Sequence, residues 1–171
     1  MLENILDFHI QYKPVVRFGK IIEGYYSTKS GVIFSDKSKS TLKPHESWRR
    51  LSDGTKVLRE VTVKFFIDHD LYDDYNYGCN GKTVIKLQSR RTIRVPVHRV
   101  VAETWMPIDE YPPASLKDTW NDVPESWRQW VRDTAFIDHI DSDVTNNDIH
   151  NLRWVTPKEN QPHRKEQSLS L

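Results

Sequence analysis

The sequence lacks several features that would assign it to a class at once. Its 171 residues contain a single cysteine, Cys79, so neither an intramolecular disulfide nor a CxxC zinc site can form. No apolar run approaches the roughly 18 to 20 residues of a membrane-spanning helix, and residues 1–10 show no basic n-region or cleavage site. We therefore expect no membrane span, no signal peptide, no structural zinc, and a cytoplasmic location.

An excess of charge of one sign is also missing. Lys and Arg number 25 against 24 Asp and Glu, which gives a net charge of +1 and by itself argues against a nucleic-acid partner. The charges are segregated, however, with eleven cations and four acids in residues 13–59 and six cations without an acid in residues 81–99. Acids dominate residues 60–80 and 103–125, so a basic face can exist while other regions cancel it in the total.

The basic stretch 81–99 has the pattern of strands. Its cations alternate with aliphatic residues, which would place several of them on one face of a sheet, where they can follow a phosphate backbone. A solvated face without a partner is the alternative interpretation. The candidate DNA-contacting cations of this stretch are Lys86, Arg90, Arg91, Arg94 and Arg99.

Length and composition allow one sizeable core, and the chain shows no internal repeat. Short β-like pieces separated by turns fill the first part, including a turn at residues 52–54 and a strand over residues 57–67. Paired strands at 83–87 and 92–97, a helix at 98–105 and a long connection are expected next. A helix then starts at Pro124, and we expect its Trp127 and Trp130 to lie in the core rather than to stack on DNA.

The segment most informative about chemistry is AFIDHIDSDVTNNDIHNLRWVTPKENQ, residues 135–161. It reads as a strand, a polar loop, a second strand and a helix. The helix start is marked by Thr156, Pro157 and Glu159, which form a capping box with proline at the favoured first position. Trp154 of the second strand is expected in the core, and Arg153 is a candidate phosphate contact.

Four polar side chains of this segment can act together on a phosphate. Asp138 and Asn160 offer the oxygen ligands that a hard divalent cation prefers. The imidazole of His139 can take a proton from a water that attacks phosphorus, because histidine titrates near neutral pH. Asn151 would fix the loop and the imidazole. Strand alternation would send Asp138 and His139 to opposite faces unless the strand ends or bulges there.

These residues resemble a known family of nucleases. An Asp-His pair, an Asn twelve residues after that His, and a His or Asn nine further on are typical of the HNH, or ββα-metal, nucleases, as is the stretch NLRWVT. The resemblance is to the zinc-free branch of phage homing endonucleases, intron-encoded or free-standing. VPVHRVVAETW resembles the strand and helix before the motif in that branch, and YYSTKSGVIFS resembles a small N-terminal DNA-contacting module often fused to it.

The resemblance implies cleavage of double-stranded DNA with Mg²⁺ or Mn²⁺. It implies His139 as general base, Asp138 and Asn160 as metal ligands, and Asn151 as the orienting residue. The third position is Asn160 rather than a histidine, so His163 is a further candidate on the same helix. His98 could either support the scissile phosphate or make a structural hydrogen bond.

We therefore expect an α+β protein with two regions. A β-rich DNA-contacting region would span residues 1–80, and an HNH nuclease domain would span residues 81–171, with its ββα core at about 135–165. A non-cleaving DNA-binding protein and an RNA-binding module, whose tyrosines would stack bases, are the alternatives. The acids of residues 68–74 form either a second metal site or a solvated loop, and a monomer or a homodimer are both open.

Overall fold

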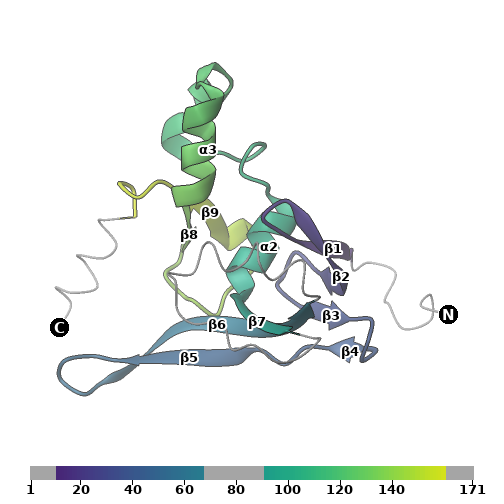
Figure 1. Cartoon of the computed structure of the whole chain (residues 1–171). Helices are drawn as coiled ribbons and strands as arrows, with labels where there is room; N and C mark the ends of the chain where they lie inside the picture. The colour runs from purple at the N-terminus through teal and green to yellow at the C-terminus, as the bar shows by residue number, and fades with distance from the viewer. Residues whose placement is uncertain (1–10, 68–90, 161–171) are drawn as a thin grey trace.

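The computed structural model of this chain describes residues 11–67 and 91–160, which form three antiparallel sheets around a central helix (Figure 1). The acidic stretch 68–74, the strand expected at 83–87, and Lys86, Arg90 and His163 lie outside the described residues. Among the described residues no helix is long and apolar enough to cross a membrane. The expected α+β class is confirmed.

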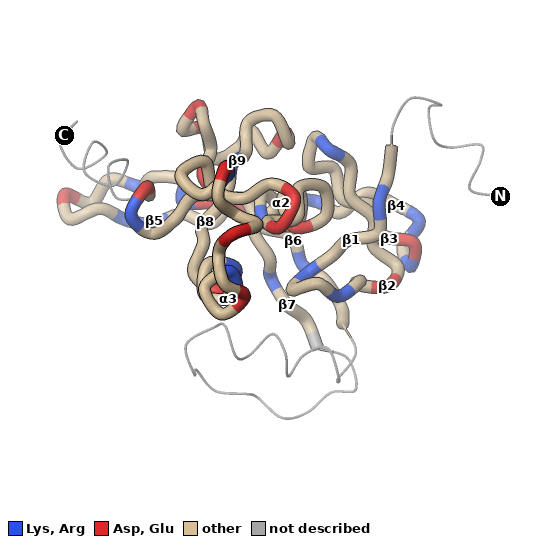
Figure 2. The backbone as a smooth tube through the Cα atoms, turned by 90° about the horizontal axis from the view of Figure 1, so that it is seen from above, with Lys and Arg blue, Asp and Glu red and all other residues tan. Residues whose placement is uncertain are grey.

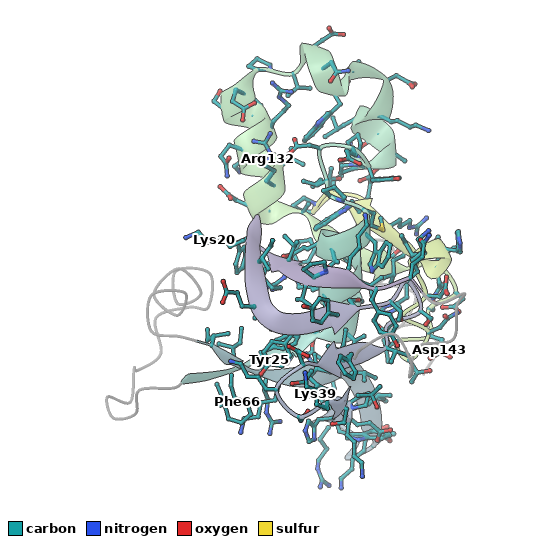
Figure 3. All side chains as sticks on the ribbon, turned by 90° about the vertical axis from the view of Figure 1, so that its right-hand side faces the viewer. Lys20, Tyr25, Lys39, Phe66, Arg132 and Asp143 are labelled. Atoms are coloured by element: carbon teal, nitrogen blue, oxygen red, sulfur yellow. The ribbon has the colours of Figure 1, made fainter. Side chains whose placement is uncertain are left out.

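The N-terminal sheet is a four-stranded meander that packs against the second sheet. Phe18 and Gly19 join its first two strands, and both have a positive φ, as a two-residue hairpin turn requires. Tyr25 meets the ring of Phe65 edge-on with centroids 4.8 Å apart, and its hydroxyl accepts the N–H of Phe66 at 3.0 Å (Figure 3). The strands, in order, are β1 (Lys13–Arg17), β2 (Lys20–Ser27), β3 (Ile33–Ser35) and β4 (Ser40–Thr41).

The second sheet has three strands and a long projecting hairpin (Figure 1). Its strands are β5 (His45–Arg50), β6 (Lys56–Ile67) and β7 (Arg91–Pro96). The turn expected at 52–54 joins β5 to β6, and Gly54 has a φ of 88° there. β7 pairs with β6, with Val95 opposite Val63. The expected pairing of residues 92–97 with 83–87 involves residues outside the described part. β6, twelve residues long, is the central strand and pairs with β5 on one edge and with β7 on the other.

Helix α2 (Val97–Trp105) lies at the centre of the molecule and confirms the helix expected at 98–105 (Figure 1). It begins directly after Pro96, whose missing N–H suits both a strand end and a helix start. Val100 and Val101 are completely buried in the core that joins the three sheets. An ion pair between Glu103 and Arg17 of β1 fixes the helix to the N-terminal sheet.

The connection after α2 forms an arm that stands away from the sheets (Figure 1). It contains a 3-10 helix that the sequence did not predict, η1 (Ala114–Asp122), and then α3 (Glu125–Thr134), which confirms the helix expected from residue 124. The expected burial of Trp127 and Trp130 is wrong, because these side chains are 64% and 51% exposed and only Val131 of α3 is buried. A helix that projects from the body buries only a narrow stripe of its surface. Helical spacing shows which residues lie on the same face but not how much of that face is covered by other elements.

The last elements form the strand, loop and strand expected from residues 135–155. They are β8 (Phe136–His139), the short 3-10 helix η2 (Ile149–Asn151) and β9 (Leu152–Val155). β8 and β9 pair antiparallel, with Ile137 opposite Trp154. Trp154 is buried as expected, and its indole N–H donates to the carbonyl of Met106 at 2.7 Å. This bond ties the hairpin to the end of α2.

Candidate active site

The β8–β9 hairpin separates the two leading candidates onto opposite faces. Asp138 pairs with Arg153 in the register, and the next residue, His139, pairs with Leu152. Because strand side chains alternate, His139 and buried Leu152 face α2, while Asp138 and Arg153 face outward. The alternation that the sequence predicts for Asp138 and His139 is therefore present, although His139 is the last residue of its strand.

The outward face carries a charge pair. Arg153 donates from Nε at 2.9 Å and from Nη2 at 2.7 Å to the same oxygen, Oδ2, of Asp138. The side chain of Arg153 is 44% exposed and that of Asp138 is 14% exposed. The structure thus brings the proposed metal ligand and the proposed phosphate contact together. A cavity of about 530 Å³ lies beside them, lined by Arg153, Tyr111 and Glu159 among others.

The inward face holds the imidazole of His139, which is 7% exposed. Its Nε2 lies 3.3 Å from Oδ1 of Asn147. Its ring meets the ring of His98 edge-on, with centroids 5.1 Å apart and planes at 80°. The histidine is thus enclosed by the loop that follows β8 and by the first turn of α2.

The side chain that lies against the imidazole of His139 is Asn147, whereas the sequence suggested Asn151. Asn151 uses its amide on the loop instead. Its Nδ2 donates to Oδ1 of Asp141 and to the carbonyl of Asn146, both at 2.8 Å, and its Oδ1 accepts the N–H of Asp141 at 3.1 Å. The part of the expectation in which Asn151 fixes the loop is confirmed. Sequence spacing gave no signal for Asn147, which looks like an ordinary turn residue.

Hydrogen bonds within the loop between β8 and η2 hold its carboxylates in the charged form. The amide of Asn146, the N–H of Asp143 and the amide of Asn151 all lower the pKa of Asp141, in that order of size. The hydroxyl and the N–H of Thr145 likewise lower the pKa of Asp143, which Figure 3 labels at the edge of the molecule. Both carboxylates accept hydrogen bonds from within the loop, so they help to fix its shape.

His98 occupies the first turn of α2 behind His139. Its Nδ1 is buried and has no hydrogen-bond partner within the described part of the chain. Burial, followed by the charges of His139, Arg99 and Arg17, lowers the pKa of His98 to about 3. The ring is therefore neutral near pH 7 and packs edge-on against the candidate base.

Asn160 lies on the turn that follows β9. The capping box is confirmed, because the N–H of Thr156 donates to Oε2 of Glu159 at 2.6 Å and the N–H of Glu159 donates to Oγ1 of Thr156 at 3.3 Å. The N–H of Asn160 donates to the carbonyl of Thr156 at 3.1 Å, as in the first turn of a helix. Residues beyond Asn160, where the expected helix would continue, lie outside the described residues.

The candidate metal ligands are few and contain only oxygen donors. No group of three or more His, Cys, Asp or Glu residues that could hold a metal occurs in residues 11–67 and 91–160. A site built from Asp138 and Asn160 would supply one carboxylate and one amide oxygen and would leave further positions for water and phosphate. That donor set suits a hard cation such as Mg²⁺ and not zinc.

The candidate DNA-contacting cations fall on different elements. Arg94 is exposed on β7 opposite Lys64 of β6, and Arg99 on α2 lies 3.8 Å from Glu103. Arg91 is the first residue of β7, and its side chain is outside the described part. The β5–β6 hairpin adds exposed cations that the sequence reasoning did not single out, shown in blue in Figure 2, next to the 53% exposed Trp48. These cations, called the basic hairpin below, are Arg49, Arg50, Lys56 and Arg59.

A family model and a solved structure match this chain. A solved structure described as "DNA binding and cleavage by the HNH homing endonuclease I-HmuI" is similar to this chain, with 21% identity, a TM-score of 0.45, and an alignment that covers 92% of this chain and 59% of that one. No curated protein matches. Residues 131–161 match the family model described as HNH endonuclease. This matched segment contains Asp138, His139, Asn151 and Asn160.

Proposed function

We propose that this protein is a metal-dependent endonuclease that hydrolyses phosphodiester bonds of double-stranded DNA. The observation that carries the proposal is His139, a buried imidazole with a fixed hydrogen-bond partner, directly after Asp138 in a hairpin of the HNH family. A general base must be held in a fixed position near the water that it deprotonates, and histidine is the side chain that most often serves as one.

The residues expected to hold a divalent cation fit one. Asp138 already has a cationic group against its carboxylate, since Arg153 donates twice to Oδ2, so this position accommodates positive charge. Asn160 would add an amide oxygen, and both donors are of the type that Mg²⁺ and Mn²⁺ prefer. When bound, the cation would neutralise charge on the scissile phosphate and stabilise the leaving 3′ oxygen.

In the proposed reaction His139 removes a proton from water while the water oxygen forms a bond to phosphorus. The bond from phosphorus to the 3′ oxygen breaks, and the 3′ oxygen takes up a proton from solvent. The products are a 5′ phosphate and a 3′ hydroxyl. Arg153 would bind a phosphate oxygen through the guanidinium that now meets Asp138.

We place the DNA along the second sheet. Exposed cations are spaced along this elongated sheet. They are the cross-strand pair Lys64 and Arg94 and the basic hairpin, and the 48% exposed ring of Phe66 lies on β6 near Lys64. The arm with α3 suits this role less, because Arg132 there is bonded to Asp109 and Glu125 (Figure 3). Phosphate contacts by exposed Lys and Arg supply most non-specific DNA affinity.

The finer assignment, a phage homing endonuclease in the host cytoplasm, rests on the sequence resemblance of the NLRWVT stretch and of the VPVHRVVAETW segment. One catalytic centre per chain would nick one strand. A double-strand break would then need a homodimer or two successive events.

The test uses the full chain with a mixed pool of duplex DNA, with and without Mg²⁺, followed by mapping of the cleaved ends. We expect Mg²⁺-dependent cleavage with 5′ phosphate ends in the wild type and none in His139→Ala. Binding of duplex DNA without cleavage at any Mg²⁺ or Mn²⁺ concentration would establish the non-cleaving alternative. Competition by single-stranded RNA in preference to duplex DNA would establish the RNA-binding one.

A further inference from the structure

Asn147 is the side chain in contact with the proposed base, and its own orientation is fixed by the loop. It is 7% exposed, its Nδ2 donates to the carbonyl of Thr145 at 3.0 Å, and its Oδ1 lies 3.3 Å from Nε2 of His139. The opposite orientation of the amide would place its oxygen against the carbonyl oxygen of Thr145. The loop therefore presents the amide oxygen, an acceptor only, to His139.

An acceptor at this position determines which nitrogen of the imidazole carries the proton. A neutral imidazole has one N–H and one bare nitrogen, and Nε2 must be the N–H to bond with the oxygen of Asn147. We propose that Asn147 is a positioning residue that holds His139 in the Nε2–H form and leaves Nδ1 as the atom that accepts the proton from water. This proposal rests on the proposed nuclease function.

A turn of the N-terminal sheet holds the loop in place around Asn147. The turn between β2 and β3 reaches the loop at Gly31, where an added Cβ would lie 3.0 Å from Cβ of Asn147 and 3.1 Å from Cγ1 of Val97. On the other side of Asn147, the N–H of Ile149 donates to the carbonyl of Lys29 at 2.8 Å. The turn that supports the positioning residue thus comes from the sheet that precedes the nuclease segment in the chain.

Gly31 is required in this turn for two reasons. Its φ of 86° belongs to the left-handed region that favours glycine, and its missing side chain allows the close approach to Asn147. Gly19 has a similar φ of 73° but no atom within 4 Å of an added Cβ. Both Gly31→Ala and Gly19→Ala strain the backbone, but only Gly31→Ala also pushes on Asn147. Comparing the two variants therefore isolates the effect of displacing Asn147.

The first test reads the tautomer directly and needs neither metal nor DNA. Long-range ¹H–¹⁵N NMR spectra of the full chain identify the protonated ring nitrogen, and the His139→Gln spectrum assigns the signal. We expect Nε2–H for His139 in the wild type and in Asn147→Asp, whose carboxylate keeps the acceptor, and a mixture of forms in Asn147→Leu. A wild type with Nδ1–H, or an unchanged tautomer in a folded Asn147→Leu protein, would overturn the proposal.

The second test separates chemistry from DNA binding in cleavage assays. We expect kcat to fall about 10- to 100-fold in Asn147→Leu with KM for DNA within about twofold of the wild type, and Asn147→Asp to recover most of the loss. Gly31→Ala should lower kcat about tenfold, and Gly19→Ala should leave it unchanged. A raised KM with an unchanged kcat would contradict the positioning role. If no DNA is cleaved at all, the proposed function fails while the NMR result still decides the role of Asn147.

Discussion

The two faces of β8 differ in how completely the protein has arranged them. On the inner face His139 is enclosed, with Asn147 at Nε2 and His98 against its ring. On the outer face Asp138 meets Arg153, a side chain that is 44% exposed and borders a cavity. The imidazole of His139 is therefore held by protein groups on the inner face, whereas on the outer face Asp138 is bonded to a partly exposed guanidinium. In the proposed function, the proton acceptor is preorganised, and the guanidinium gives way to a divalent cation.

The largest effect should follow from loss of the inner imidazole. His139→Ala removes the proposed proton acceptor, and general base catalysis is worth about 10²- to 10⁴-fold. We expect single-turnover cleavage to fall about 100- to 10,000-fold while DNA affinity, measured by gel shift at the same Mg²⁺ concentration, stays within about threefold. Cleavage at the wild-type rate would show that the enclosed face has no part in the chemistry.

A smaller effect is expected when the outer carboxylate becomes an amide. Asp138→Asn keeps the shape of the side chain but removes the charge that attracts a divalent cation, so cleavage at low Mg²⁺ should fall about 100-fold. Because the inner face is untouched, a Mg²⁺ or Mn²⁺ titration should restore part of the activity at high concentration. An unchanged Mg²⁺ dependence would show that the cation is held elsewhere.

The burial of His98 on the inner face can be tested by the pH dependence of the free energy of unfolding, without an activity assay. The pKa of His98 is lowered from 6.5 to about 3, mainly by burial and then by the facing charges of His139, Arg99 and Arg17. Between these two values the unfolded chain binds a proton at His98 that the folded protein excludes. The free energy of unfolding is therefore not reduced by His98 above pH 6.5, and it decreases as the pH falls from 6.5 toward 3.

His98→Phe cannot be protonated and keeps an aromatic ring against His139. Between pH 7 and pH 5 the wild type should lose ~2 kcal/mol more free energy of unfolding than this variant, as measured in urea titrations at both values. Comparing the change with pH removes any constant effect of the larger ring. Parallel curves for the two proteins would mean that solvent reaches His98 in the folded state.

Local signals made the outer face predictable from the sequence. The capping box of Thr156 and Glu159 and the strands on both sides of the loop depend on residues close in the chain, and each of them appears in the structure. Strand alternation alone would separate Asp138 and His139, and the structure places them on opposite faces although β8 ends at His139. The inner face could not be predicted in the same way, because the loop that orients Asn147 through Thr145 also packs against Gly31 of a turn distant in the sequence.

Helix α3 in the arm also shows that local sequence signals do not determine burial. The spacing of Trp127 and Trp130 correctly predicted a helix, but their burial depended on whether another element covers that side, and none does among the described residues. A helical period states which residues share a face. Only the tertiary arrangement decides whether that face meets protein or solvent.

The smallest expected effect is also the one most specific to the outer face. Arg153→Leu removes the cation that competes for Asp138 and, in the proposed reaction, a contact to phosphate. An exposed ion pair is worth up to about 1 kcal/mol, so Mg²⁺ affinity of the DNA-free protein, measured by calorimetry, should rise about three- to fivefold. Cleavage should fall by a similar factor, and Arg94→Leu on the second sheet should weaken DNA binding without changing Mg²⁺ affinity. If Arg153→Leu lowered Mg²⁺ affinity instead, the guanidinium would be supporting the metal site and not exchanging with the cation, and the contrast between the two faces of β8 would not hold.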